Sequence, residues 1–270
     1  MPDFTQITAL EAQLQRELFE EPPKDAVAVR TADGRRIGLM HSKRAQKLAT
    51  DARFCDDFQL TEDALVVFPQ SSDSLEADFA RVARPLHDAG YFLQWRDELL
   101  DVDDLDTGEC IAHAERGLFR FFGMLTSSVY GVGVRTDGRV FVSLRSRTKQ
   151  VDPGLWDALA AGMISEGESP LTALPREIAE EAGLHSGYTI EPAWRRLCVR
   201  RTVPEGWMAE DAYACLVIVS DEVEPANADG EVEEIRCLHK DELFAMIESG
   251  QCPVDTALVF LTLLFEENPS

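Results

Sequence analysis

Three glutamates in the second half of the chain have a spacing that suits a hard metal ion. Glu177, Glu180 and Glu181 stand at positions i, i+3 and i+4, so a helix would carry all three carboxylates on one face. Like charges placed in this way repel one another, and Arg176 offsets only part of that repulsion. Grouped carboxylate oxygens are typical ligands of Mg²⁺, which also takes waters and phosphate oxygens. The alternative is an ordinary solvated helix face.

Residues on both sides of the glutamates complete a longer motif. Gly162, Glu168, Arg176 and Gly183 stand at fixed distances from them within residues 162–184. The segment matches every specified position of the box G-x5-E-x7-R-E-U-x-E-E-x-G-U, where U is a bulky apolar residue. It therefore resembles the Nudix hydrolases. A solvated helix face does not explain the additional matched positions.

The resemblance implies a fold, a cofactor and a reaction. The implied fold is the α/β Nudix fold, a mixed sheet sandwiched between helices, here with a smaller N-terminal α+β domain. The implied cofactor is Mg²⁺ or Mn²⁺, and the reaction is attack of water on one phosphorus of a diphosphate. The implied metal ligands are Glu177, Glu180, Glu181 and the backbone carbonyl of Gly162. Arg176 and Glu168 would hold the carboxylates in place.

Pro175 falls where the box helix is expected to be continuous. A proline inside a helix removes a backbone donor and crowds the preceding turn, which costs about 3 kcal/mol or more. Either the helix kinks there, or Ser169 and Pro170 open a separate turn and Pro175 begins the catalytic helix. We therefore predict a kink or break within residues 171–175.

Motifs outside the box resemble a narrower Nudix subgroup, whose members carry an N-terminal domain of unknown function and are in part related to thiamine pyrophosphokinase. They are residues 95–98, 115–116, 121–123, 145–150, 153–154, 157 and 229–232. The sequence departs from the subgroup at Ala158 and Met163. The resemblance covers residues 25–245 and implies hydrolysis of thiamine diphosphate, or its damaged oxy and oxo forms, to the monophosphate. The alternatives are a nucleotide-linked diphosphate, such as ADP-ribose or a nucleotide sugar, and a non-catalytic ligand-sensing module.

Basic residues ahead of the box are candidates to bind the diphosphate. Arg145, Arg147 and Lys149 are the first choice, because guanidinium forks match phosphate geometry. The alternative is a solvated turn after a strand. A second basic patch comprises Arg195, Arg196, Arg200 and Arg201, of which alternating residues of a strand could reach a pocket.

A general base is often supplied from outside the box. Glu231 occupies the matching position, and Glu233 and Glu234 compete with it. Each of them could instead be a solvated loop carboxylate. Trp156, Trp207 and Phe141 could stack on an aromatic base, although core packing is the default for such residues.

Composition limits the class of partner. The 270 residues include 26 basic and 49 acidic side chains, for a formal net charge of -23. This balance argues against binding of nucleic acid or anionic lipid, and leaves a small-molecule diphosphate approached through metal. No apolar run approaches 18 residues, and residues 1–20 do not resemble a secretory signal. Six scattered cysteines without a C-x-x-C pair predict free thiols in a reducing cytoplasm. We also allow for a homodimer.

Periodicity and turn signals predict the elements that position these residues. The predicted helices are residues 7–20, 42–50, 75–89, 110–124, 169–183 and a C-terminal helix from 254. The predicted strands are residues 26–30, 35–40, 64–69, 95–102, 129–135, 140–144, 156–163, 191–200, 213–220 and 235–238. A change from mixed elements to strands places the domain boundary near residues 110–125. We predict an accessory domain over residues 1–120 and a Nudix hydrolase domain over residues 121–270.

Overall fold

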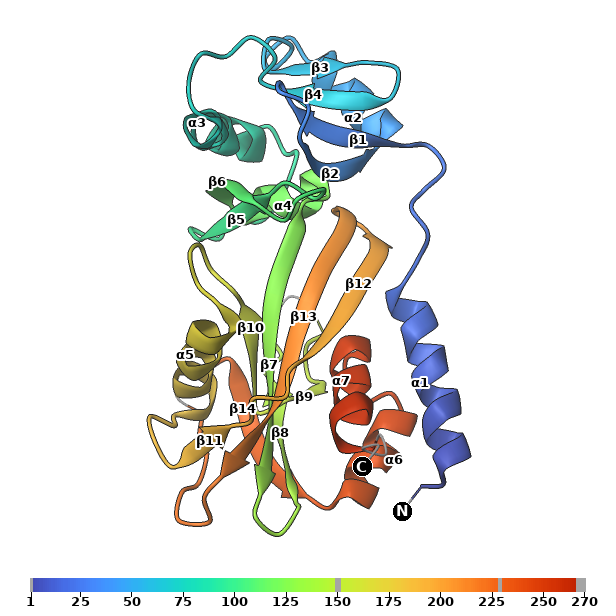
Figure 1. Cartoon of the computed structure of the whole chain (residues 1–270), viewed down its shortest axis with the longest axis vertical. Coiled ribbons are helices and arrows are strands. Elements are labelled where there is room, and N and C mark those ends of the chain that lie inside the picture. The colour runs from blue at the N-terminus through green and yellow to red at the C-terminus, as the bar shows by residue number, and fades with distance from the viewer. Residues whose placement is uncertain (1, 149–151, 228–229, 266–270) are drawn as a thin grey trace.

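The computed structural model describes residues 2–148, 152–227 and 230–265. Its main sheet runs through the lower half of Figure 1 in the order β11-β13-β7-β8-β14, with β10, β12 and β9 paired to β7, β13 and β8. The strands are β7 (Leu125–Arg135), β8 (Val140–Arg145), β9 (Trp156–Asp157), β10 (Ala160–Met163), β11 (Tyr188–Ile190), β12 (Arg195–Val203), β13 (Gly206–Val219) and β14 (Val232–Leu238). The long strands β7 and β13 are parallel, whereas their other neighbours pair in the antiparallel sense.

Helices cover both faces of this sheet (Figure 1). Helix α5 (Pro170–Ala182) packs on one face, and helices α1 (Phe4–Leu18), α6 (Lys240–Glu248) and α7 (Val254–Leu264) pack on the other. Nearly every residue of β7 and β13 is buried, as expected for strands covered on both sides. The predicted α/β architecture, a mixed sheet between helices, is confirmed.

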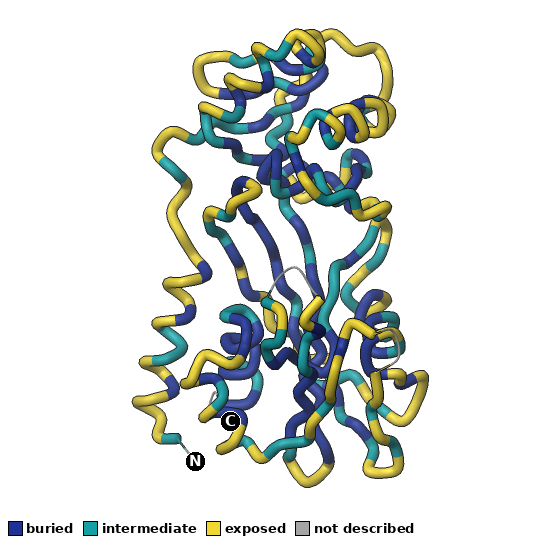
Figure 2. Tube along the Cα trace, turned by 180° about the vertical axis from the view of Figure 1, so that it is seen from behind, coloured by how far each residue is buried: buried dark blue, intermediate teal, exposed yellow. Residues whose placement is uncertain are grey.

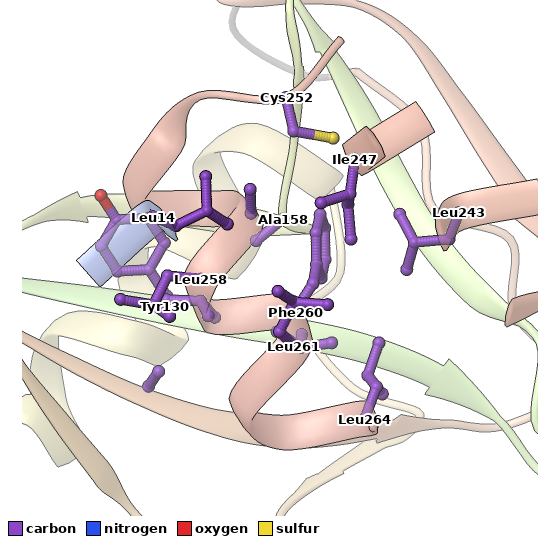
Figure 3. Packing of buried hydrophobic residues seen from close by; sticks show 14 of the residues in the cluster. Leu14, Tyr130, Ala158, Leu243, Ile247, Cys252, Leu258, Phe260, Leu261 and Leu264 are labelled. Atoms are coloured by element: carbon purple, nitrogen blue, oxygen red, sulfur yellow. The ribbon is translucent and has the colours of Figure 1, made fainter. Parts of the chain in front are cut away.

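Two apolar clusters correspond to the two faces. Alternate residues of β7 divide between them: Val129 packs toward α5, while Tyr130 and Val132 pack toward α7. Figure 3 shows the second cluster, where side chains from α6 and α7 meet those from the sheet. Leu14 of α1 belongs to this cluster, so the first helix of the chain packs beside the last. Figure 2 shows buried and exposed residues alternating along α1.

The elements from β1 to α4 form the upper half of the molecule in Figure 1, whereas α1 lies beside the lower half. The four-stranded sheet of this N-terminal region has the order β2-β1-β4-β3 and is followed by a two-stranded sheet of β5 and β6. The elements are β1 (Ala26–Thr31), β2 (Arg36–His41), α2 (Ser42–Ala49), β3 (Phe58–Leu60), β4 (Ala64–Val67), α3 (Leu75–Asp88), β5 (Leu99–Asp103), β6 (Cys110–Glu115) and α4 (Gly117–Phe122). A third apolar cluster, rich in phenylalanine, joins them.

Most predicted elements are present, with shifted ends, but the helix over residues 110–124 is wrong. Residues Cys110–Glu115 form β6, which pairs with β5, and the helix that follows covers only Gly117–Phe122. The exposed and buried residues of β6 nearly alternate, which is a strand pattern, and the acidic stretch before it closes the hairpin. The predicted strand over residues 95–102 begins only at Leu99, and α6 was not predicted.

The box helix α5 is continuous from Pro170 to Ala182 with Pro175 inside it, so the predicted break is wrong. Ser169 caps the helix through Thr172, Pro170 occupies the first turn, and Gly183 ends it with a positive φ of 65°. Pro175 removes only the hydrogen bond to the carbonyl of Leu171, one turn into the helix. Leu171 itself lies on the outer side of the helix, with 64% of its surface exposed.

Within the described residues, none of the helices has the length and apolar character that crossing a bilayer requires.

Candidate active site

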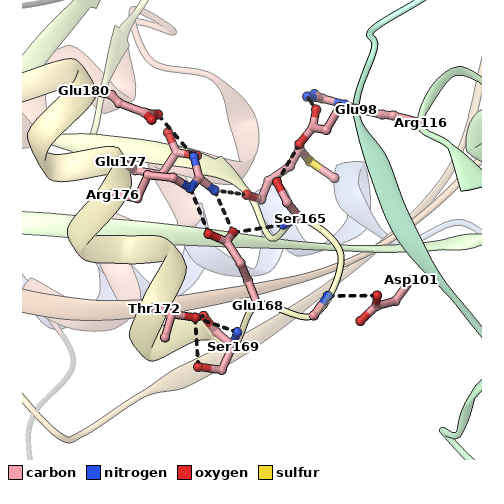
Figure 4. A network of polar contacts seen from close by, with 12 residues as sticks. Glu98, Asp101, Arg116, Ser165, Glu168, Ser169, Thr172, Arg176, Glu177 and Glu180 are labelled. Carbon is pink, nitrogen blue, oxygen red and sulfur yellow. Dashed lines mark hydrogen bonds and ion pairs between the residues drawn. The ribbon is translucent and has the colours of Figure 1, made fainter. Parts of the chain in front are cut away.

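Arg176 is the centre of the polar network that organises the box (Figure 4). Its Nε and Nη2 donate to the two carboxylate oxygens of Glu168 at 2.9 and 2.8 Å, a bidentate pair. Nη1 donates to Glu177 Oε1 at 2.7 Å and to Glu180 Oε2 at 3.2 Å, and Nη2 also donates to the carbonyl of Met163 at 3.0 Å. One guanidinium therefore connects the loop before the helix to two carboxylates on it. Its spacing of four residues from Glu180 puts these two side chains on one side of α5, and its length lets it also reach Glu177.

Glu177 is buried against strand β10. A Cβ atom built on Gly162 would lie within 3.0 Å of the Glu177 carboxylate, so the missing side chain makes room for this glutamate. Burial raises the pKa of Glu177 above its ordinary value, although Arg176 acts in the opposite direction. Glu181, also buried, accepts a hydrogen bond from the backbone N–H of Ala161 in β10 at 2.9 Å. Strand β10 thus positions two of the three box glutamates.

The donor set fits a hard divalent ion. Glu177, Glu180 and Glu181 offer carboxylate oxygens from one helix, and the side chain of Glu180 is about half exposed at 51%. Their oxygens are not drawn together to within 4.8 Å, since in the described part of the chain only Asp101, Cys110 and His113 form a group that close. Arg176 lies between Glu177 and Glu180 instead. The types of ligand match Mg²⁺ or Mn²⁺, and Arg176 offsets part of the negative charge of Glu177 and Glu180.

A cavity of about 670 Å³ lies in front of these glutamates. The N-terminal region and the main sheet both contribute to its walls. Glu177, Glu180 and Arg176 line it together with Gly162. Its cationic residues come from separate segments: Arg96, Arg116, Arg120, Arg145, Arg176 and Arg201. Its size lies within the range of pockets that bind small molecules.

The arginines from the N-terminal region gather beside one another. Arg116 donates from Nη1 to Glu98 Oε2 at 2.7 Å, and Glu98 in turn accepts from the hydroxyl of Ser165 in the box loop at 2.9 Å. Partial burial, and then the charges of Arg116 and Arg120, lower the pKa of Arg96. This repulsion between like charges would be relieved by an anion in the cavity.

Arg201 adds a donor on the opposite side of the sheet edge, at the end of β12. Its Nε–H is buried and has no hydrogen-bond partner among the described residues. A buried donor without a partner costs about 1–3 kcal/mol, which a bound acceptor would recover. Arg201 lines the same cavity as the other arginines.

Carboxylates also line the cavity, on the side of β7 and α7. Asp255 accepts from the hydroxyl of Tyr130 at 3.0 Å, and Glu210 accepts from Ser128 at 2.8 Å. Burial, reinforced by the charges of Asp157 and Glu210, raises the pKa of Asp255 to about 6. The charged form of Asp255 is therefore disfavoured on this wall.

The structure separates the predicted diphosphate ligands. Arg145 lines the cavity and donates from Nη1 to Asp157 Oδ2 at 2.6 Å. The side chain of Arg147 is 85% exposed and lies near Glu233, whereas Lys149 falls outside the described residues. Glu231 lines the cavity, but neither Glu233 nor Glu234 does.

The second basic patch divides in the same way. Arg196 and Arg200 pair with the buried carboxylate of Asp211, and of the four arginines only Arg201 lines the cavity. The tryptophans at 156 and 207 and Phe141 are buried in the core rather than lining the cavity, in agreement with the default interpretation.

Sequence reasoning did not predict that Arg96, Arg116 and Arg120 belong to the cavity. Arg96 and Arg116 belong to the upstream motifs at residues 95–98 and 115–116, which indicate only the family resemblance. Nothing in their local sequence indicates a distance to Glu177. These arginines line the cavity beside Glu177 because β5 pairs with β6. The box loop in turn contacts β5 through the hydrogen bond from Glu166 N to Leu99 O at 3.0 Å.

Comparison with known proteins agrees with this geometry. Residues 124–254 match the family model described as the NUDIX domain. An uncharacterized Nudix hydrolase of Rhodococcus erythropolis, orf19, is 41% identical over 90 residues, which are 33% of this chain and 48% of that protein. Nudix hydrolase 20, chloroplastic, of Arabidopsis thaliana is 24% identical over 214 residues, which are 77% of this chain and 56% of that protein.

The crystal structure of DR0079 from Deinococcus radiodurans aligns with 63% of this chain and all of its own, at 18% identity and a TM-score of 0.47. This chain spans about half the length of the curated relatives it matches. The family match covers every residue of the box and the strands that position it. The similarity to the Nudix family is therefore carried by residues 124–254, which contain the whole box.

Proposed function

We propose that this chain hydrolyses an organic diphosphate with the help of Mg²⁺ or Mn²⁺. One observation carries the proposal: a single cavity is lined by box glutamates on one side and by arginines from several segments on the other. The glutamates suit a divalent ion, and the arginines suit the phosphate oxygens that would approach it. The complete box also favours an active enzyme over a non-catalytic sensing module.

Each residue of the site has a proposed role that follows from its position. Glu177, Glu180 and Glu181 hold the metal, which when bound screens the phosphate charge and activates water. Glu168 and Arg176 keep the carboxylates in place through the bidentate pair. Water attacks one phosphorus, the bridging P–O bond breaks, and two phosphate-bearing products result. Glu231, which lines the cavity, is the proposed acceptor of the water's proton.

Arginines bind the remaining phosphate oxygens. Arg145 and Arg201 approach from the main sheet, whereas Arg96, Arg116 and Arg120 approach from the N-terminal region. We therefore propose that residues 1–120 act as an accessory region that completes the substrate pocket. The match to Nudix hydrolase 20 supports this, because its 214 aligned residues extend beyond the 131 residues that match the NUDIX domain. It also supports membership of the subgroup with an N-terminal domain.

For the substrate we propose thiamine diphosphate or a damaged form of it. Asp157, Glu210 and Asp255 form an acidic wall of the cavity, where burial and the charges of the first two raise the pKa of Asp255. A substrate that pairs its diphosphate with a positively charged ring would satisfy the arginines and this acidic wall together. The thiazolium ring of thiamine carries such a charge, whereas ADP-ribose and nucleotide sugars have no cationic ring.

The proposal is tested by separating and quantifying the products formed from a panel of diphosphates in the presence of Mg²⁺, because a diphosphate that bridges two organic groups releases no inorganic phosphate when its P–O–P bridge is cleaved. The panel contains thiamine diphosphate, oxythiamine diphosphate, ADP-ribose and a nucleotide sugar. We expect turnover of the thiamine compounds, loss of it in Glu180→Gln, and its retention in Glu166→Gln, which alters an exposed glutamate at a free position of the box loop. Preferred turnover of ADP-ribose would replace the substrate assignment, and no metal-dependent turnover of any compound would refute the enzyme.

A further inference from the structure

A second cluster of ligand-type side chains lies on the hairpin of β5 and β6, outside the substrate cavity. Asp101 and His113 face each other in the strand register, and Cys110 is paired with Asp103 beyond a register shift. One carboxylate oxygen, one thiol sulfur and one imidazole nitrogen lie within 4.8 Å of one another. Asp101 and His113 are half-buried, whereas Cys110 is exposed. None of the three lines the cavity of the box.

The distances between these atoms are close to those of a metal site. His113 Nε2 lies 3.4 Å from Asp101 Oδ1 and 3.9 Å from Cys110 Sγ. Tetrahedral zinc has bonds of about 2.0 Å to nitrogen or oxygen and about 2.3 Å to sulfur, so neighbouring ligand atoms stand about 3.3–3.6 Å apart. The two distances from His113 therefore differ from this spacing by a few tenths of an ångström at most, and the distance from Asp101 to Cys110 lies within 4.8 Å.

Glu76 supplies a second, independent indication. Its Oε2 lies 3.0 Å from Nδ1 of His113, on the side of the ring away from the cluster. Histidines that bind metals commonly donate this second N–H to a carboxylate, which fixes the tautomer and turns the other nitrogen toward the metal. Glu76, on α3, holds His113 in that way. A simple ion pair between His113 and Asp101 would explain neither the third group, Cys110, nor this arrangement.

We propose that Asp101, Cys110 and His113 bind a borderline-soft divalent cation such as Zn²⁺. A thiolate, an imidazole and a carboxylate form a typical set of zinc ligands, unlike the all-oxygen set of the box. The exposed side of Cys110 leaves the fourth position to water. The site is separate from the proposed hydrolysis and does not depend on it.

The site contacts the box through Asp101 (Figure 4). The backbone N–H of Gly167, between Gly162 and Glu168 of the box, donates to Asp101 Oδ1 at 3.1 Å. This is the same oxygen that lies 3.4 Å from His113 Nε2, and because a carboxylate oxygen has two lone pairs, Oδ1 can accept the N–H and bind the ion together. An ion here would stiffen the junction between the N-terminal region and the box loop.

The test is a titration of the full chain with Zn²⁺, and with Co²⁺ as a spectroscopic probe, under reducing conditions. Excess Mg²⁺ is present throughout to occupy the hard-oxygen site of the box. We expect one Zn²⁺ per chain, and with Co²⁺ a thiolate charge-transfer band together with the absorption of tetrahedral cobalt. Cys110→Ser should abolish the band, and His113→Gln should weaken binding of Zn²⁺ strongly.

Glu76→Gln tests the support of His113, and should lower the affinity for Zn²⁺ about 10–100-fold while the cobalt band survives at saturation. Cys55→Ser is the matched control, because Cys55 is an exposed thiol elsewhere and its loss should change nothing. Circular dichroism establishes that each variant is folded. Binding of Zn²⁺ that persists unchanged in Cys110→Ser and His113→Gln, or cobalt binding without a thiolate band, would overturn the proposal.

Discussion

The variant Gly162→Ala, which adds one methyl group to strand β10, tests how this strand positions the buried carboxylate of Glu177. In Gly162→Ala the new Cβ would lie within 3.0 Å of both carboxylate oxygens of Glu177, whereas ordinary contact begins at 3.4 Å. Either the carboxylate moves, or β10 withdraws from α5. Glu177 is also held by Arg176 at 2.7 Å, so its displacement disturbs the whole network of the box.

The magnitude follows from the size of this overlap. Overpacking in a filled interior costs about 1–3 kcal/mol, so we expect the free energy of unfolding to fall by this amount. A catalytic group displaced on the order of 1 Å can cost about 100-fold in rate, so kcat for the diphosphate substrate should fall by up to that factor. Both effects have one cause, the contact between the new methyl group and Glu177.

A double-mutant cycle isolates that contact. Urea denaturation measures the stability of wild type, Gly162→Ala, Glu177→Ala and the double variant. In the Glu177→Ala background the clash is absent, so Gly162→Ala should cost little stability there. Wild-type stability and kcat in Gly162→Ala, or an equal loss of stability in both backgrounds, would refute this account of Gly162.

Three further predictions concern the cavity and the box. Asp255→Asn should change how the free energy of unfolding depends on pH. In wild type the folded pKa of Asp255 is raised from 3.8 to about 6, so the free energy of unfolding should fall by up to about 3 kcal/mol as pH rises from 4 to 7. Urea denaturation should show that the free energy of unfolding of the variant, relative to that of wild type, increases by up to this amount over that pH range. A difference between the two proteins that does not change with pH would contradict the prediction. Arg176→Lys should lower kcat with the fold retained, because an ammonium cannot make the bidentate pair with Glu168 and also reach Glu177; wild-type kcat in this variant would refute the role of the guanidinium. Arg120→Ala should raise KM by about 10-fold or more with little change in kcat if the arginine binds a phosphate group, and an unchanged KM would remove Arg120 from the pocket.

The elements with clear local signals could be predicted from the sequence. The box predicted a helix that the structure places at α5, because its capping serine, its apolar face and Gly183 all act within the helix itself. Pro175 misled the prediction of a break. The cost of a helical proline depends on what surrounds the carbonyl it deprives, and that is decided in the folded chain.

The secondary structure of residues 110–124, in contrast, could not be predicted from local signals. Their apolar content does not separate a strand from a helix, and β6 exists because β5 is available to pair with it. The same pairing places Asp101 opposite His113. The group formed by Asp101, Cys110 and His113 therefore depends on this pairing, and the sequence alone did not indicate it.

By itself, the sequence determined which carboxylates of the box share a helix face, because helical periodicity is a property of one short segment. The resemblance to the Nudix box indicated the roles of Arg176 and Gly162. Only the tertiary structure decided what faces that box. The cationic wall combines Arg96, Arg116 and Arg120 with Arg201, which are distant in sequence and meet because separate sheets fold against one another. Side-chain convergence of this kind depends on packing between elements, which no local pattern records.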